Sequence, residues 1–371
     1  MYLADRVARE LRKVTEALHY FGGGEAGAQL RLESERLDCL LAVILGVRNA
    51  KGSQLRTLQR VLMQLVEALG QSRVGRQRQQ WSFSYHQCKV DIEAHGEVVG
   101  VTGSAGRLNL TLNDVHQLGY FLEIVLARWS IDTYLYESWV GASESVVDVG
   151  ANVGFLTWFY SMTGVSRVYA FEPVPEVYRL KHADPKRIKF YQYCVGEMAG
   201  NVRLYKSSTH LQGNTTEITM VRRFPTVFGA NLSSIKCPSI AYDDLFKDIY
   251  VDFIKVDIEG SETAFLSGAR TALGNGNIGA VQIEVYDEAY EDVVPCLCEN
   301  FGGGYVVVES RDGELGLYPI HADLAVSELV YVTRATPPTY FFSRNMPRSL
   351  SNPASVNRRR RSGGEMPESS V

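Results

Sequence analysis

Asp148-Val149-Gly150-Ala151-Asn152-Val153-Gly154 lies between an apolar run, Ser145-Val146-Val147, and a helix-like stretch, Phe155–Met162. This succession predicts a buried strand, a tight turn that contains glycine, and a helix. In parallel α/β sheets that arrangement places a cofactor at the carboxyl edge of the strand. Asn152 stands where the dinucleotide fingerprint G-x-G-x-x-G has its middle glycine, and an acid precedes the first glycine. The turn therefore disfavours a dehydrogenase. It favours a cofactor without phosphates that offers an amino group and a sulfonium, which is S-adenosylmethionine (SAM).

The turn supplies two kinds of contact to such a ligand. Gly150 and Gly154 lack a Cβ and tolerate positive φ, so a ligand can approach the backbone there. The first N–H groups of the following helix are unpaired donors that can hold a carboxylate. Asp148, at the end of the strand, can face the cationic amino-acid part of the cofactor. We therefore predict cofactor contacts at Asp148, Gly150, Asn152 and Gly154.

A second acid ends the next predicted strand, over residues 167–171. Glu172 follows the apolar segment Val168-Tyr169-Ala170-Phe171 and stands 18 residues after Gly154. A carboxylate in this position can accept hydrogen bonds from both ribose hydroxyls of a nucleoside. The sequence therefore predicts Glu172 as a ribose ligand, with a surface glutamate in a loop as the alternative.

Two more acids close the predicted fourth strand, over residues 253–258. Asp257 and Glu259 would lie beside the first strand, at the switch point where open α/β sheets bind ligands. Carboxylates there can orient a hydroxyl, take its proton or bind a divalent ion. We expect Asp257 to be the stronger site residue, because Glu259 can equally well cap the helix that is expected over residues 262–272.

Glu284 interrupts the apolar fifth strand, predicted over residues 280–285. A charge inside such a strand is costly unless it is paired or faces the cleft. Glu284 is therefore a third catalytic candidate, with a structural salt bridge as the alternative. The cleft can also be bordered by His182, His210 and His321, but no motif surrounds them, so ordinary surface or half-buried histidines are expected.

The remaining patterns divide the chain into four regions. Residues 1–72 carry apolar side chains at helical spacing and are expected to form helices that pack internally or in a homodimer. Residues 73–114 contain a linker and short alternating segments that predict a small antiparallel sheet. Residues 115–335 alternate strand and helix patterns. Residues 336–371, rich in Pro, Ser, Asn and Arg, are expected to be a disordered tail. Further strand candidates in the third region are 188–194, 304–308 and 328–333.

Bulk properties exclude several classes of protein. The chain has 371 residues, 45% of them apolar and 22% charged, as in a globular protein. A net charge of −4 disfavours a general nucleic-acid binder, which is basic overall. No apolar run approaches the roughly 20 residues that span a bilayer, and the charged N-terminus is unlike a secretory signal. The six cysteines form no metal-binding cluster. A cytoplasmic protein with reduced thiols and no metal site is expected.

Five stretches together resemble the FkbM-type family of SAM-dependent class-I methyltransferases, in order and in spacing. The resemblance covers about residues 115–335, and the residues before this range have no counterpart in the family. Residues 206–236 form a long loop that is expected either to shape the acceptor pocket or to be a passive insertion. The matching stretches are V-V-D-V-G-A-N-V-G (146–154), Y-A-F-E-P (169–173), Y-D-D-L (242–245), F-I-K-V-D-I-E-G-S-E (253–262) and I-E-V-Y (283–286).

This resemblance implies a Rossmann-like α/β fold: a seven-stranded sheet with an antiparallel final strand and helices on both faces. It also implies SAM as the cofactor. By this resemblance, Asp148, Gly150, Asn152 and Gly154 would border the methionine part of SAM. Glu172 would contact its ribose, and Cys194 with Val195 would lie near its adenine.

The function expected from the resemblance is O-methylation of a hydroxyl on a sugar or another small or secondary metabolite. Asp257, Glu259 or Glu284 would assist removal of the proton. Transfer to a nitrogen or a carboxylate, and a catalytically inactive SAM-binding interaction protein, are the alternatives. The expected partner is therefore a small-molecule or glycan acceptor, with no nucleic acid and no transmembrane segment. Similarity of fold does not name the acceptor.

Overall fold

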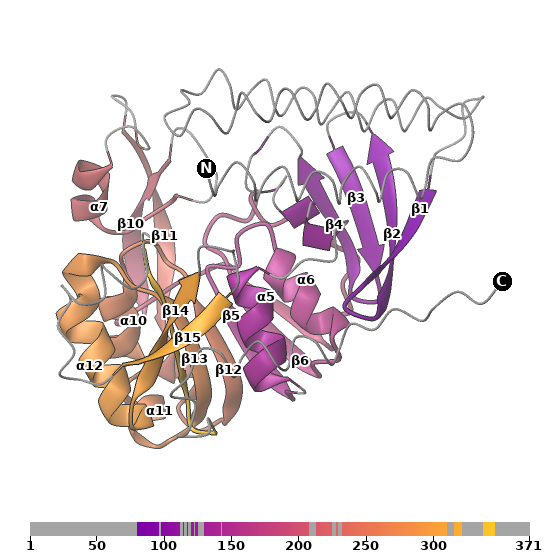
Figure 1. Cartoon of the computed structure of the whole chain (residues 1–371). Coiled ribbons are helices and arrows are strands. Elements are labelled where there is room, and N and C mark those ends of the chain that lie inside the picture. Colours follow the sequence, from indigo (N-terminus) through magenta and orange to yellow (C-terminus); the bar gives the residue numbers. More distant parts are fainter. Residues whose placement is uncertain are drawn as a thin grey trace, which may run out of the picture.

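The computed structural model contains a large α/β sheet with a smaller sheet beside it (Figure 1). The helices predicted within residues 1–72 and the strand predicted at 328–333 lie outside the described residues. The described residues are 80–95, 98–111, 114, 117, 120–121, 123–124, 130–141, 143–207, 213–224, 228, 232–309, 315–320 and 337–345.

Eight strands form the large sheet, in the order β15-β14-β16-β13-β12-β5-β6-β8. The strands from β13 to β8 run parallel to one another, and β16 runs antiparallel between β13 and β14. The bounds are β5 (Ser145–Val149), β6 (Arg167–Phe171), β8 (Ile188–Tyr191), β12 (Val251–Val256), β13 (Ile278–Glu284), β14 (Gly304–Glu309), β15 (Leu315–Ile320) and β16 (Thr339–Ser343).

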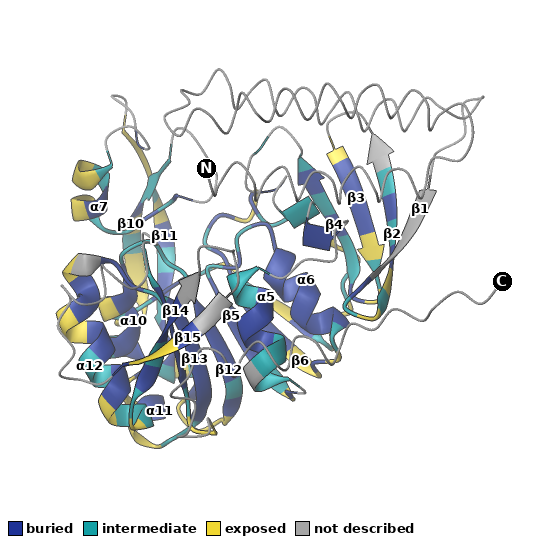
Figure 2. Ribbon diagram, in the orientation of Figure 1, coloured by how far each residue is buried: buried dark blue, intermediate teal, exposed yellow. Residues whose placement is uncertain are grey.

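The order of the strands creates a switch point between β5 and β12. From β5 the chain moves outward to β6 and β8, then returns to β12 on the opposite side of β5. The two crossovers leave in opposite directions, so a crevice opens above the carboxyl ends of β5 and β12. The central strands are mostly apolar because both faces of a parallel sheet are covered, and Asp148 and Lys255 are exceptions near the ends of β5 and β12. Figure 2 shows these strands as buried.

Helices cover both faces of the large sheet. Val146 packs in one apolar cluster with Trp158, whereas the next residue, Val147, packs in another cluster with Phe265. This alternation follows from the two-residue period of a strand. The first face carries α6 (Phe155–Met162); helices α9 (Asp243–Phe246), α10 (Glu262–Gly268), α11 (Arg270–Gly274) and α12 (Tyr290–Phe301) cover the second.

The small antiparallel sheet expected in residues 73–114 is present and is joined to the rest of the fold. Its order is β1-β2-β3-β4-β7. The short strand β7 (Leu180–Lys181) follows β6 in the chain and pairs with β4. Tyr85 stacks on Trp158 of α6 with 6.1 Å between ring centroids. One core therefore serves both sheets. The other bounds are β1 (Gln80–Tyr85), β2 (Cys88–His95), β3 (Val98–Gly103) and β4 (Gly106–Thr111).

Shorter elements flank the crevice. Helix α5 (Ile131–Leu135) continues into a π-helix, η1 (Tyr136–Val140), just before β5. A three-stranded sheet has the order β10-β11-β9, and its hairpin connection carries α7 (Ile218–Arg223). The remaining bounds are β9 (Cys194–Gly196), β10 (Gly200–Lys206), β11 (Ser233–Ala241) and the 3-10 helix η2 (Asp287–Ala289).

Three expectations from the sequence need correction. The large sheet has eight strands among the described residues rather than seven, because β15 pairs with β14. The tail expected from residue 336 contains β16, whose apolar side chains are buried inside the sheet. The single helix expected at 262–272 is divided into α10 and α11 at Ala269. No helix of the described residues is long and apolar enough to cross a membrane.

Candidate active site

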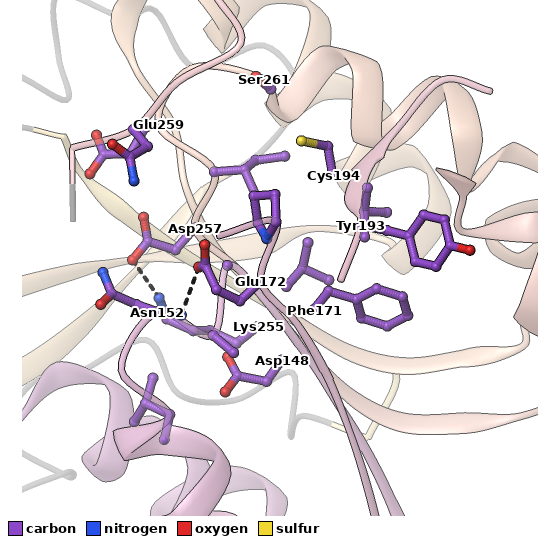
Figure 3. Close-up of a pocket in the computed structure, with 18 of the residues that line it drawn as sticks. Asp148, Asn152, Phe171, Glu172, Tyr193, Cys194, Lys255, Asp257, Glu259 and Ser261 are labelled. Atoms are coloured by element: carbon purple, nitrogen blue, oxygen red, sulfur yellow. Dashed lines mark hydrogen bonds and ion pairs between the residues drawn. The ribbon is translucent and has the colours of Figure 1, made fainter. Parts of the chain in front are cut away.

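A pocket opens at the carboxyl edge of the large sheet, where β5 and β12 lie side by side. Eight of the ten site residues predicted from the sequence line it. Gly154 and Glu284 do not. Figure 3 shows the labelled side chains converging from several separate strand ends. The eight lining residues are Asp148, Gly150, Asn152, Glu172, Cys194, Val195, Asp257 and Glu259.

Gly150 allows the exits of β5 and β12 to touch. Its φ is +83°, and a Cβ added there would lie 1.9 Å from the carbonyl oxygen of Asp257. The N–H groups of Gly150 and Ala151 both donate to the carbonyl of Phe171, at 3.0 and 2.9 Å. The turn is therefore held to both neighbouring strands by backbone contacts, and only glycine fits at position 150.

Glu172 braces the same turn. One carboxylate oxygen accepts from the N–H of Asn152 at 3.0 Å, and the other accepts from the N–H of Val174 at 2.9 Å. These bonds hold Asn152 in its left-handed conformation, with φ +50°. Burial raises the pKa of Glu172 to about 7. Each carboxylate oxygen keeps a second lone pair that can accept from a hydroxyl.

Asp148 is the floor of the pocket and is only 1% exposed. Its Oδ2 accepts from the hydroxyl of Thr157 at 2.6 Å, and its Oδ1 has no hydrogen-bond partner among the described residues. Burial raises the pKa of Asp148 to about 6. A buried carboxylate oxygen without a donor is costly unless a ligand or water supplies one.

Lys255 lies next to Asp148 and was not predicted as a site residue. It is 3% exposed, and its Nζ forms an ion pair with Oδ2 of Asp257 at 2.7 Å (Figure 3). The carboxylates of Asp257 and Asp132 raise its pKa well above the usual value, against the opposing effect of burial. A charged side chain is as unusual in a central parallel strand at Lys255 as it is at Glu284, because burial of a charge is costly. This feature of the sequence could have indicated Lys255 as a site residue.

Glu259 and Tyr286 form a hydrogen-bonded pair on the other side of Asp257. The Tyr286 hydroxyl donates to Oε2 of Glu259 at 2.7 Å. Glu259 has φ +53°, a conformation that a non-glycine residue adopts only when its surroundings impose it. Burial first, and the charge of Asp257 second, raise the pKa of Glu259 to about 7. Tyr286 ends the I-E-V-Y stretch, but nothing in the sequence indicated that it contacts Glu259.

The long loop over residues 206–236 reaches the site next to the segment that follows β12. Asn214 and Thr216 line the pocket. The Thr215 hydroxyl donates to the carbonyl of Glu259 at 2.6 Å, and Thr216 shares a short hydrogen bond with Ser261. These contacts fix the loop to the segment that follows β12, so this part of the loop forms a wall of the pocket.

Aromatic rings line the opposite end of the pocket. Phe171 and Tyr193 line it together with Cys194 and Val195. The Phe171 ring stacks on Tyr191 at 4.8 Å with an interplanar angle of 10°. This end offers an apolar surface for a flat ring, where the sequence placed adenine.

The other predicted residues lie away from the pocket. Gly154 begins α6 with φ +87° and packs against Tyr178. Glu284 is half-buried at the end of β13, and burial raises its pKa well above the usual value. His182 is exposed, and His210 and His321 lie outside the described residues. The described residues contain no group of three or more His, Cys, Asp or Glu that could hold a metal ion.

Fold and pocket together define an α/β protein with a pocket at the switch point of its sheet, the place where open α/β sheets bind ligands. Residues 148–309 match the family model described as the methyltransferase FkbM domain. This match confirms the resemblance found from the five sequence stretches, and it does so for residues 148–309.

Among solved structures, two spermidine synthase chains are similar at 12% identity. A complex with the transition-state analogue AdoDATO gives a TM-score of 0.31 over 77% of this chain and 80% of that chain. The enzyme from Thermotoga maritima gives 0.30 over 77% and 81%. Neither likeness is close enough to support an argument. No curated protein matches the sequence.

Proposed function

We propose that this protein is a SAM-dependent methyltransferase that transfers a methyl group to a hydroxyl of a sugar or another small metabolite. The observation that carries the proposal is the pocket at the β5–β12 switch point, lined by the Gly150 turn inside the matched domain. The substrate and the choice of oxygen rest on the resemblance alone.

The residues of the pocket fit SAM chemically. Gly150 provides a cradle that a Cβ would fill, and the buried Oδ1 of Asp148 lacks a donor among the described residues. Four carboxyl side chains line the pocket against one amine, Lys255. A negative, partly desolvated site of this kind favours a ligand with net positive charge.

Bound SAM would supply a methyl group on a sulfonium, which is already a good leaving group. The protein's part is then to align the acceptor oxygen and to remove its proton. Among the three predicted carboxylates, Glu259 is best suited to that task. It lines the pocket, its pKa of about 7 is near neutral pH, and no described residue donates a hydrogen bond to its Oε1.

The other two carboxylates are less suitable as the base. Asp257 is held in an ion pair with Lys255, so its Oδ2 is already engaged by a side chain of the protein. Glu284 does not line the pocket. We therefore propose Glu259 as the base, Tyr286 as the residue that orients it, and Asp257 as an orienting group for the acceptor.

Calorimetric titration with SAM and S-adenosylhomocysteine tests the proposal. We expect micromolar binding to the wild type, worth about 8 kcal/mol, and its loss in Asp148→Ala because the ligand's cationic part loses its buried counter-charge. Asp184→Ala is a matched control, since Asp184 is exposed and does not line the pocket. Equal affinity in wild type and Asp148→Ala would contradict the site assignment.

An inactive SAM-binding interaction protein remains the second candidate from the sequence. The two proposals differ in turnover, so an acceptor screen that follows release of S-adenosylhomocysteine separates them. The same screen separates hydroxyl acceptors from amines and carboxylates. Glu259→Gln should lose turnover and still bind S-adenosylhomocysteine, because that ligand lacks the positive sulfonium that the Glu259 carboxylate would attract.

A further inference from the structure

Lys255 is the one cationic side chain among the described residues that line the pocket. It occupies the interior of β12, where burial of an ammonium is strongly unfavourable without compensation. A single ion pair with Asp257 is its only hydrogen-bonded contact among the described residues. An ammonium has three N–H donors, so two remain for a ligand or water.

Asp148 lies directly beside Lys255. The two residues are paired in register on the parallel strands β5 and β12, so their side chains leave the same face of the sheet about 5 Å apart. The Nζ of Lys255 has N–H donors without a partner among the described residues. The buried Oδ1 of Asp148 is an acceptor without a donor among them, and both residues line the pocket floor. The pocket floor therefore presents a positive and a negative group side by side.

The turn before α6 offers fewer free N–H groups for a ligand carboxylate than the sequence indicates. The N–H of Asn152 already donates to Glu172, and the N–H of Gly154 donates to the carbonyl of Ala151. A ligand carboxylate in this turn also meets a pocket with four carboxyl side chains. It needs a cation close by, and Lys255 is the one available on the described lining.

We infer that Lys255 and Asp148 together hold the zwitterionic α-amino-acid head of the cofactor, with Lys255 binding its carboxylate and Asp148 its ammonium. This inference rests on the proposed function and assigns a ligand contact to a residue that the sequence did not indicate. A zwitterion adds no net charge to the pocket floor. Its carboxylate would meet the remaining N–H donors of Lys255, and its ammonium would meet the Oδ1 of Asp148.

The test is calorimetry with three ligands: S-adenosylhomocysteine, its analogue without the α-carboxylate, and its analogue without the α-amine. Against wild type, we expect loss of the carboxylate and loss of the amine each to weaken binding about tenfold or more, the size of a charge-assisted hydrogen bond. Lys255→Met should weaken S-adenosylhomocysteine equally, yet bind the decarboxylated analogue as the wild type does. Asp148→Asn should show the same pattern with the deaminated analogue.

Asp257→Asn is the control for an indirect role, because it removes the partner of Lys255 and leaves the lysine. It should retain the preference for the carboxylate. If Asp257→Asn abolishes that preference as fully as Lys255→Met, Lys255 acts only by positioning Asp257 and the inference is wrong.

Folding is checked by thermal unfolding of each variant. If Lys255→Met does not fold, the wild-type titrations still decide, because equal affinity for S-adenosylhomocysteine and its decarboxylated analogue would overturn the assignment. Absence of any binding to wild type would instead contradict the proposed function, and this inference with it.

Discussion

Gly150 has a role that no other residue can fill, and this can be tested against a second glycine. Both Gly150 and Gly164 have positive φ, +83° and +99°, but a Cβ meets the backbone of Asp257 at the first and nothing within 4 Å at the second. Gly164→Ala should therefore lower the free energy of unfolding by about 1–2 kcal/mol, the cost of a left-handed alanine. Gly150→Ala should lower it further and abolish binding of S-adenosylhomocysteine.

Urea unfolding and calorimetry measure the two effects. Equal losses of stability in the two variants, with binding retained in Gly150→Ala, would mean that the close approach of the β5 and β12 exits is not needed for the site.

The acids of the site were predictable from one rule. Asp148, Glu172 and Asp257 each end or follow an apolar strand, and carboxyl ends of parallel strands meet at one edge. Lys255 and Tyr286 escaped prediction for different reasons. Lys255 stands at the same register position as Asp148, but it is a cation and the rule selects acids. The partner of Tyr286 is fixed by the strained backbone at Glu259.

Strand β16 shows where composition misleads about an element. The segment from residue 336 is rich in Pro, Ser, Asn and Arg as a whole, but it contains Tyr340-Phe341-Phe342, three aromatic residues that are at most 1% exposed. By contrast, β6 has the predicted bounds, 167–171, because its apolar run is followed directly by Glu172 and Pro173. A five-residue strand needs long-range pairing to form. Strands β13 and β14 were predicted, but their pairing with residues 339–343 is not visible in the local sequence.

Truncation tests the contribution of β16. A chain that ends at Pro338 loses the strand between β13 and β14, together with the burial of three aromatic side chains worth roughly 1.5–3 kcal/mol each. That sum is comparable to the whole stability of a typical domain, about 5–15 kcal/mol. We expect this chain to be unfolded or insoluble. A chain that ends at Asn345 keeps the full sheet and is the control.

Circular dichroism and binding of S-adenosylhomocysteine distinguish the two chains. If the chain ending at Pro338 folds and binds like the chain ending at Asn345, the pairing of β14 through β16 does not support the sheet.

The charge of the pocket is a property of the whole fold, because three separate chain segments contribute to it. Asp148, Glu172 and Glu259 come from different parts of the chain, and burial raises the pKa of Asp148 to about 6 and those of the other two to about 7. With raised values, these groups are mostly protonated at pH 5.5 and mostly ionised at pH 7.5. The unliganded pocket therefore becomes more negative across this range, while Lys255 stays charged.

This change predicts how the protein distinguishes SAM from S-adenosylhomocysteine. The two ligands differ by a methyl group and by the positive charge of the sulfonium. Contacts with the amino-acid head that they share cancel in a ratio of affinities, so the ratio reports the attraction of the ionised carboxyls for the sulfonium. The ratio of their dissociation constants should shift in favour of SAM by several-fold between pH 5.5 and 7.5, as measured by calorimetry in buffers of equal ionic strength. Glu172→Gln removes one titrating group without adding charge and should reduce the shift. A ratio that does not change with pH would mean that the sulfonium lies outside the field of these carboxyls, and that the methyl group itself carries the discrimination.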